Sequence, residues 1–187
     1  MTTTTEPNSW VIDPTHSNLS FSVRHLMISK VRGSFGKFAG EAKTDGLNCV
    51  HLTGIVDTTS ISTNDENRDG HLKSADFFDV ENYPTMTLTA KEFTVSADST
   101  FTVEADLTIK DVTRPVTLRG EFGGIVQDPY GKTKAAMELT GKINRTDWGL
   151  NWNSPLETGG VLIGEEITIH ADIQAVLVDT EEGAVLS

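Results

Sequence analysis

The stretch FTVEADLTI, residues 101–109, alternates apolar and polar side chains at every position. Phe101, Val103, Ala105, Leu107 and Ile109 therefore share one face of an extended chain, and threonine and carboxylate side chains share the other. A period of two residues predicts a β-strand that buries one face and exposes the other to water.

The same alternation recurs along most of the chain. It is clear in five more segments, residues 19–24, 86–91, 116–122, 137–143 and 166–173, and weaker near residues 10–13, 35–43 and 52–57. Turn-forming residues such as Asp45-Gly46 and Asp128-Pro129-Tyr130-Gly131 separate several of these runs. About eight or nine strands joined by short connections predict an antiparallel, all-β barrel or sandwich.

Two segments break the alternation. Residues 63–84 open with Thr63-Asn64-Asp65-Glu66, a capping-box pattern, and reach Gly70, so we expect a short helix that stops there. Residues 144–164 carry two tryptophans, a proline and glycines, which predicts a long loop. Long loops in compact domains are often functional, so both segments are candidates for one end of a binding site.

Length and charge narrow the class of protein. The chain has 187 residues, enough for one domain with a real core, and its net charge is -12. That negative field disfavours phosphate-tracking nucleic-acid binding and attraction to anionic membranes. We expect a single domain over residues 9–178, a disordered tail over residues 1–8 and an acidic tail over residues 179–187.

The sequence offers little support for a secreted, membrane-spanning or disulfide-bonded protein. Cys49 is the single cysteine, and it is expected to be a small, inert residue in a hairpin turn. The first residues, MTTTTEPNSW, lack the basic and apolar regions of a signal peptide, and no segment reaches the ~20 apolar residues of a membrane helix. We therefore expect a cytoplasmic location.

The inward positions leave two interpretations of the barrel interior open. Several of them are small, namely Ala90, Ala105, Gly120, Ala135, Gly141 and Ala171. An eight-stranded barrel can be filled by side chains or can hold one small ligand. The small residues either leave an apolar tunnel or only allow the strands to coil and pack closely.

Motifs of common enzymes are absent from the sequence. It contains no nucleophile elbow, phosphate-binding loop, dinucleotide fingerprint or zinc-type pairing of histidines and cysteines. A metal- or haem-dependent enzyme would need His16, His25 and His71 to converge, and we keep this as the alternative to a non-enzymatic protein.

Motifs spread over residues 10–175 resemble those of the YceI-like family. They are DPTHS (13–17), FSVRH (21–25), RDGHL (68–72), LTIKDVTRPV (107–116), INR (143–145) and WGL (148–150). The resemblance implies an eight-stranded, antiparallel, lipocalin-like extended β-barrel, often dimeric, that holds a polyisoprenoid, an isoprenoid quinone or another long-chain amphiphile. It implies no resident cofactor, and this chain resembles the cytoplasmic branch of the family.

A lipid-binding barrel of this kind requires an apolar lumen, because a prenyl chain gains affinity mainly by burying its methylene groups. The residues that we expect to line the lumen are Leu19, Phe21, Val23, Phe35, Phe38, Phe77, Phe78, Met86, Leu88, Val103, Leu107, Leu118, Phe122, Met137, Leu139, Trp148, Ile167 and Ile169.

A polar head group would need polar partners at the lumen mouth, and Arg68, His71, Arg114 and Arg145 are the candidates. Each also has a structural interpretation. Arg68 could fasten its loop together with Asp69, and His71 could fill a half-buried polar site. Arg114 could cap a strand end, and Arg145 could stack on Trp148 or pair with Asp147.

Overall fold

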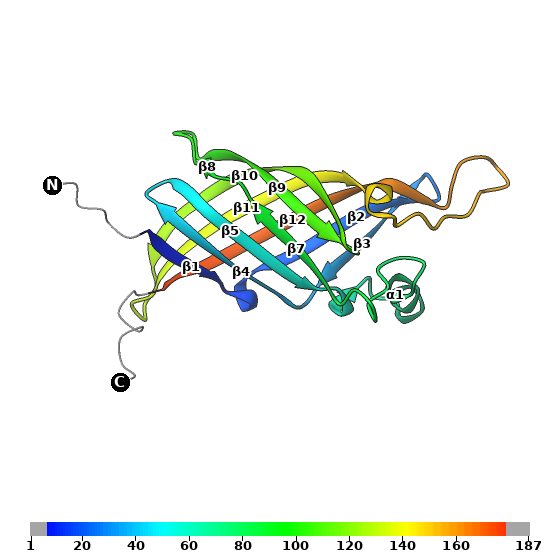
Figure 1. The fold of residues 1–187 in the computed structure, drawn as a ribbon, viewed down its shortest axis with the longest axis horizontal. Helices are drawn as coiled ribbons and strands as arrows, with labels where there is room; N and C mark the ends of the chain where they lie inside the picture. The colour runs from blue at the N-terminus through cyan, green and yellow to red at the C-terminus, as the bar shows by residue number, and fades with distance from the viewer. Residues whose placement is uncertain (1–6, 179–187) are drawn as a thin grey trace.

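The computed structural model describes residues 7–178, and its strands belong to one antiparallel sheet (Figure 1). The strands are β1 (Asn8–Ile12), β2 (Asn18–His25), β3 (Ser29–Phe35), β4 (Phe38–Asp45), β5 (Asn48–Asp57), β6 (Ile61–Ser62), β7 (Thr85–Ala90), β8 (Phe93–Thr94), β9 (Thr100–Ile109), β10 (Val112–Gln127), β11 (Thr133–Asn144) and β12 (Ile163–Val178). The helices are α1 (Glu66–Lys73) and three 3-10 turns, η1 (Pro14–His16), η2 (Thr58–Ser60) and η3 (Arg145–Trp148).

Eight of these strands close a barrel, which confirms the predicted fold. The order β1-β4-β5-β7-β9-β10-β11-β12 returns to β1, because β12 pairs with β1 over Ala175–Val178. Nearer its start, over residues 163–172, β12 pairs with β2 instead. The η1 turn separates β1 from β2, and β3 and β6 extend the sheet beyond β2, so the barrel is elongated (Figure 1).

Three strands were missed by the sequence prediction: β3 and the two-residue strands β6 and β8. Residues 35–43, expected as a single strand, are the end of β3 and most of β4, with a turn at Gly36 and Lys37. In β3, Val31, Gly33 and Phe35 face inward, but the glycine weakens the apolar alternation. The ring of Phe21 occupies the space beside Gly33 where a side chain would lie.

The helix of residues 63–84 exists, but its expected boundaries were wrong. Asp65, not Thr63, caps α1, and its carboxylate accepts a hydrogen bond from the Arg68 N–H at 2.9 Å. The helix also continues through Gly70 to Lys73, and the Ser74 N–H closes it by donating to the His71 carbonyl. Gly70 keeps a negative φ there, so it gives no reason for the helix to stop.

Most residues of the two expected tails lie outside the range that the structure describes. Asn8, which was assigned to the N-terminal tail, is the first residue of β1. The expected tails at residues 1–6 and 179–187 lie beyond the described residues. None of the helices formed by residues 7–178 combines the length and apolar character that a membrane crossing requires.

The barrel interior is packed on one side, where β9, β10 and β11 meet η3. Its buried cluster includes Val103, Ala105, Leu118 and Trp148. Small inward residues here serve packing: the Phe101 ring lies over Gly120, and the Leu118 side chain lies over Gly141. Close packing, rather than an empty tunnel, therefore explains these two glycines.

Candidate ligand-binding site

The other side of the interior contains a cavity of about 330 Å³. Aliphatic and phenyl side chains from β2, β3, β5, β7, β11 and β12 form most of its wall, together with residues of the segment 63–84, which we call the lid. The size falls within the ~300–1,000 Å³ that is typical of small-molecule sites. Ala171 lines this cavity, so one of the small inward residues does widen it.

Most residues predicted for the lumen lie on the wall of this cavity. They are Leu19, Phe21, Val23, Phe35, Phe38, Phe77, Phe78, Met86, Leu88, Leu107, Leu118, Met137, Leu139, Ile167 and Ile169. Val103, Phe122 and Trp148 do not line it and were placed there wrongly. They face inward, but on the packed side, where neighbouring side chains cover them.

Several lining residues were not predicted, among them Ile12, Val31, His25 and Thr63. Val31 was missed because β3 was not recognised as a strand. Its alternation with Lys30 and Arg32 was the available signal. His25 occupies an inward position at the end of β2, in register with Ser29 of β3, where only its place in the alternation could have shown it.

Beside β6 and β7, no strand pairing closes the cavity wall. Within residues 7–178, β6 pairs only with β3, and β7 pairs with β5 and β9. The lid runs from the end of β6 to the start of β7 and covers this place. Phe78 of the lid meets the Phe35 ring edge-on, with 5.9 Å between ring centroids. Side chains, rather than ladder hydrogen bonds, therefore close the barrel here.

The far end of the cavity is plugged by a small apolar cluster. Trp10 packs there with Ala135 and Ala175, and its indole N–H donates to the Thr44 hydroxyl at 3.0 Å. The arginine and histidine residues of the lining, His25, Arg68, His71 and Arg145, all come from segments at the α1 end, whereas Ser20, Glu41, Thr53 and Thr87 line other parts of the wall. We therefore take the α1 end as the mouth of the cavity.

Arg68 lies at this mouth and anchors the lid. Its Nε donates to the Thr63 hydroxyl at 2.7 Å, and its Nη2 donates to the Thr63 carbonyl at 2.8 Å. Asp69 accepts hydrogen bonds from the backbone N–H and the hydroxyl of the same threonine. The fastening role proposed for the Arg68 and Asp69 pair is confirmed, with Thr63 as the partner. Among residues 7–178, Nη1 of Arg68 has no hydrogen-bond partner.

His71 connects the lid to the loop that follows η3. Its Nε2 lies 2.8 Å from Oδ2 of Asp76, and its ring meets the Trp152 ring edge-on at 4.6 Å. A second edge-on contact joins it to Phe77 at 5.1 Å. The imidazole is thus half-buried among aromatic rings beside the cavity, with one nitrogen held by a carboxylate.

Arg145 is buried beneath the mouth and organises the backbone around it. Its guanidinium donates to the carbonyls of Leu150 and Trp152 in the 149–162 loop and to those of Ile163 and Gly164 at the start of β12. Burial lowers the pKa of this guanidinium from its ordinary value, although nearby Glu165 opposes the shift. The expected stacking on Trp148 and ion pair with Asp147 are not formed; backbone carbonyls take their place.

Arg114, the fourth head-group candidate, lies beside η3. It lies in β10 rather than in a turn, is exposed, and makes one hydrogen bond to the Asp147 carbonyl at 3.3 Å. It pairs with Leu107 and lies two residues before Val116, so it belongs to the face of β10 that these apolar residues share, but it is exposed near the start of the strand. The side chain of Arg114 does not line the cavity.

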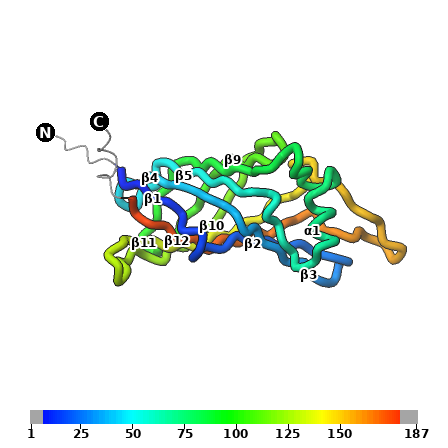
Figure 2. Tube along the Cα trace, turned by 90° about the horizontal axis from the view of Figure 1, so that it is seen from below, coloured from blue at the N-terminus to red at the C-terminus, as the bar shows by residue number. Residues whose placement is uncertain are grey.

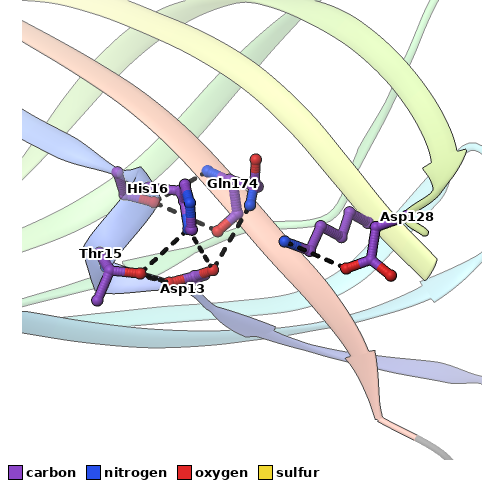
Figure 3. Close-up of polar contacts among 7 residues, drawn as sticks. Asp13, Thr15, His16, Asp128 and Gln174 are labelled. Carbon is purple, nitrogen blue, oxygen red and sulfur yellow. Dashed lines mark hydrogen bonds and ion pairs between the residues drawn. The ribbon is translucent and has the colours of Figure 1, made fainter. Parts of the chain in front are cut away.

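The three histidines of the metal alternative do not converge. His16 lies before β2 and bonds Asp13 Oδ2 at 2.8 Å (Figure 3), whereas His25 ends β2, so the eight residues of that strand separate them by ~25 Å. Residues 7–178 hold no group of three or more histidine, cysteine or acidic side chains suited to a metal ion. The metal- or haem-dependent alternative is therefore wrong in the form that required these histidines.

Comparisons with known proteins agree with this architecture. The model of the YceI-like domain matches residues 10–175. A UPF0312 protein of Staphylococcus aureus strain MSSA476 is 37% identical over 169 residues, which cover 89% of this chain and 96% of that protein.

Solved structures show the same fold. A YceI protein of Campylobacter jejuni is 28% identical, with a TM-score of 0.71, over 83% of this chain and 90% of that one. A domain of Saccharophagus degradans described as polyisoprenoid binding has a TM-score of 0.70 at 15% identity, over 90% of this chain and 98% of that one. With the barrel, its lumen and these matches in agreement, the chain belongs to the YceI-like domain family.

Proposed function

We propose that this protein binds a long-chain isoprenoid amphiphile, such as a polyprenyl lipid or an isoprenoid quinone, and stores or carries it without catalysing a reaction. The observation that carries the proposal is the division of the cavity wall. The wall is overwhelmingly apolar, and its arginine and histidine side chains, Arg68, His71, Arg145 and His25, come from the α1 end. A long hydrocarbon chain with a compact polar head fits that division.

Hydrophobic burial would supply most of the affinity. Each methylene group transferred from water contributes about 0.8 kcal/mol before the ordering costs of binding are subtracted. Polar contacts inside the lumen would contribute little affinity, since its wall offers few hydrogen-bond donors or acceptors. The name of the Saccharophagus degradans domain supports the ligand class, although its sequence identity to this chain is low.

The head group would lie between Arg68 and His71. Arg68 keeps Nη1 for a ligand oxygen, while its other donors hold Thr63. His71 contributes an imidazole beside the cavity. Quinone and phosphate oxygens both accept hydrogen bonds, so Nη1 of Arg68 suits either head group, while the His71 ring, whose Nε2–H donates to Asp76, would pack beside it. Arg145 has its donors on carbonyls and would position the mouth instead of binding the head.

Purification without detergent, followed by solvent extraction and mass spectrometry, tests the proposal. We expect a long-chain isoprenoid to co-purify at a stoichiometry near one per barrel. Recovery of no long-chain amphiphile, together with failure to bind added prenyl alcohols or quinones, would overturn it.

A matched pair of variants tests whether the ligand occupies the lumen. Ala171→Phe fills part of the cavity, whereas His170→Phe adds the same ring one residue away on the outer face of β12. We expect A171F to lose most of the bound lipid and H170F to retain it, with thermal melts confirming that both variants fold. Equal lipid retention by the two variants would place the ligand elsewhere.

A further inference from the structure

The turn between β2 and β3 exposes three consecutive apolar side chains. Leu26, Met27 and Ile28 are 40%, 54% and 82% exposed, respectively. The sheet gains nothing from them at this position, since they lie beyond the last cross-strand pair, His25 with Ser29. We call these three residues the tip.

The backbone of the tip is unusual for apolar residues. Leu26 and Met27 have φ values of 53° and 63°, in the left-handed region that glycine and asparagine occupy more readily. The Ile28 N–H closes the turn on the His25 carbonyl. Strained residues of this kind persist mainly where they serve a function. Exposed apolar side chains in a strained turn therefore indicate a binding partner.

A second segment supports the tip. The Leu26 N–H donates to the Leu162 carbonyl at 2.9 Å, and Met27 packs against Gly160. Val161 beside them is 36% exposed and extends the apolar surface. Both views of the fold show the β2–β3 turn and the 149–162 loop projecting beyond α1 at one end of the barrel (Figures 1 and 2).

The hairpin behind the tip is basic on its outer face. Arg24 lies directly opposite Lys30, and Arg32 lies opposite Ser22, so three cations share one face of β2 and β3. None of the three forms an ion pair with another of residues 7–178. Opposed like charges are unfavourable across strands. The clustering of these three cations, in a chain of net charge -12, indicates an anionic partner.

The inner face of the same hairpin leads into the cavity. His25 lines the cavity just behind the tip, and the cross-strand pair Val23 and Val31 lines it two residues farther along β2. The hairpin that carries the tip and the basic face therefore also forms part of the cavity wall at the mouth.

We propose that the β2–β3 hairpin docks on a lipid bilayer that carries anionic headgroups. The tip inserts between headgroups, Arg24, Lys30 and Arg32 contact phosphates, and the mouth faces the bilayer from which a ligand is drawn. Exposed apolar side chains combined with a basic face are the usual requirements for such interfacial binding. The step of ligand uptake rests on the proposed function, but docking does not.

The negative net charge does not prevent this docking, although it predicts little general attraction to anionic membranes. Charges act over about 8–10 Å at physiological salt, so the patch nearest the surface dominates. The loop beside the tip carries one carboxylate, Glu157, and the β12 bulge beside Arg24 carries two more, Glu165 and Glu166, of which Glu166 is paired with Lys142. Asp65 and Glu66 of the lid are repelled by the same surface, which orients the barrel with the tip foremost.

Flotation with vesicles tests docking on the full chain. Vesicles of phosphatidylcholine with phosphatidylglycerol, free of any isoprenoid, are compared with vesicles of phosphatidylcholine alone. We expect the protein to float with the anionic vesicles only, and high salt to release it. Two double variants should each lower the partition coefficient at least about fivefold, namely Met27→Ser with Ile28→Ser and Lys30→Gln with Arg32→Gln.

A control removes apolar surface at the other end of the barrel. Val126 and Tyr130 are 66% and 90% exposed near the β10–β11 turn, so Val126→Ser with Tyr130→Ser should float like the unmodified protein. Equal losses in the control and the tip variants, or no flotation of the unmodified protein at low salt, would overturn docking. A dimer in gel filtration that disappears in the tip variants would also overturn docking, because the tip would then be a contact between two copies of the chain. Because these vesicles lack isoprenoid, the outcome is independent of lumen occupancy.

Discussion

The guanidinium carbon of Arg145 lies 6.0 Å from the centre of the Phe77 ring, so the buried cation of η3 supports the lid from below. Phe77 is 4% exposed and also meets the rings of His71 and Trp152. The lid and the 149–162 loop are therefore joined through one arginine and three rings. This arrangement explains why two segments far apart in sequence form one mouth.

Replacing Arg145 should destabilise the fold strongly. Arg145→Met leaves four carbonyls without this donor, and each unpaired buried group costs about 1 kcal/mol or more, so we expect the free energy of unfolding to fall by about 3 kcal/mol or more. Urea unfolding measures it. Arg114→Met, an exposed control with one hydrogen bond, should stay within about 0.5 kcal/mol. A similar loss in both variants would contradict the role given to Arg145.

The two lid phenylalanines should separate stability from ligand exchange. Phe77→Ala removes a buried ring and should cost about 3–5 kcal/mol of unfolding free energy. Phe78 is only half-buried and closes the wall against Phe35, so Phe78→Ala should cost less but speed the release of a fluorescent long-chain lipid. Stopped-flow release and urea curves give both quantities. Slower release from F78A would rule out the lid as the closing element.

Substitutions at the tip that suit its backbone should raise the free energy of unfolding and weaken docking on vesicles. Leu26→Asn with Met27→Gly suits the left-handed backbone and should raise the unfolding free energy by about 1–2 kcal/mol, as read from urea curves. The same pair removes two exposed apolar side chains, so flotation with anionic vesicles should weaken. A variant that gains stability and floats as before would show that the apolar tip is dispensable.

Asp13 should make stability depend on pH in acid. The Thr15 hydroxyl, chiefly, and His16 hold the pKa of the Asp13 carboxyl well below its ordinary value of 3.8 (Figure 3). Because the folded state binds this proton less readily than the unfolded chain, the contribution is complete above 3.8 and is lost as the pH falls towards the folded pKa.

Urea curves of Asp13→Asn and of the unmodified protein at pH 6 and pH 3 test this dependence. We expect the difference between their midpoints to shrink at pH 3. Glu138→Gln, on the exposed face of β11, reports the effect of removing one negative charge without such hydrogen bonds. If the Asp13→Asn difference is unchanged or grows in acid, the proposed cause is wrong.

Alternation predicted the barrel and most of its lumen because it records which face of a strand avoids water. It could not divide the inward residues between packed side and cavity: Val103 and Val23 obey the same pattern, yet only Val23 lines the cavity. That division depends on which strands lie opposite one another. Arg145 shows a second limit, since its partners are backbone carbonyls, which no sequence pattern displays.

The absence of a strand pair between β6 and β7 has a mechanical consequence for this barrel. Where strands pair, the wall can widen only by breaking ladder hydrogen bonds together, whereas at the lid it can open by separating ring contacts worth about 0.5–1.5 kcal/mol each. If the barrel binds the proposed amphiphile, ligands of different width would pass at the lid without separating any pair of strands.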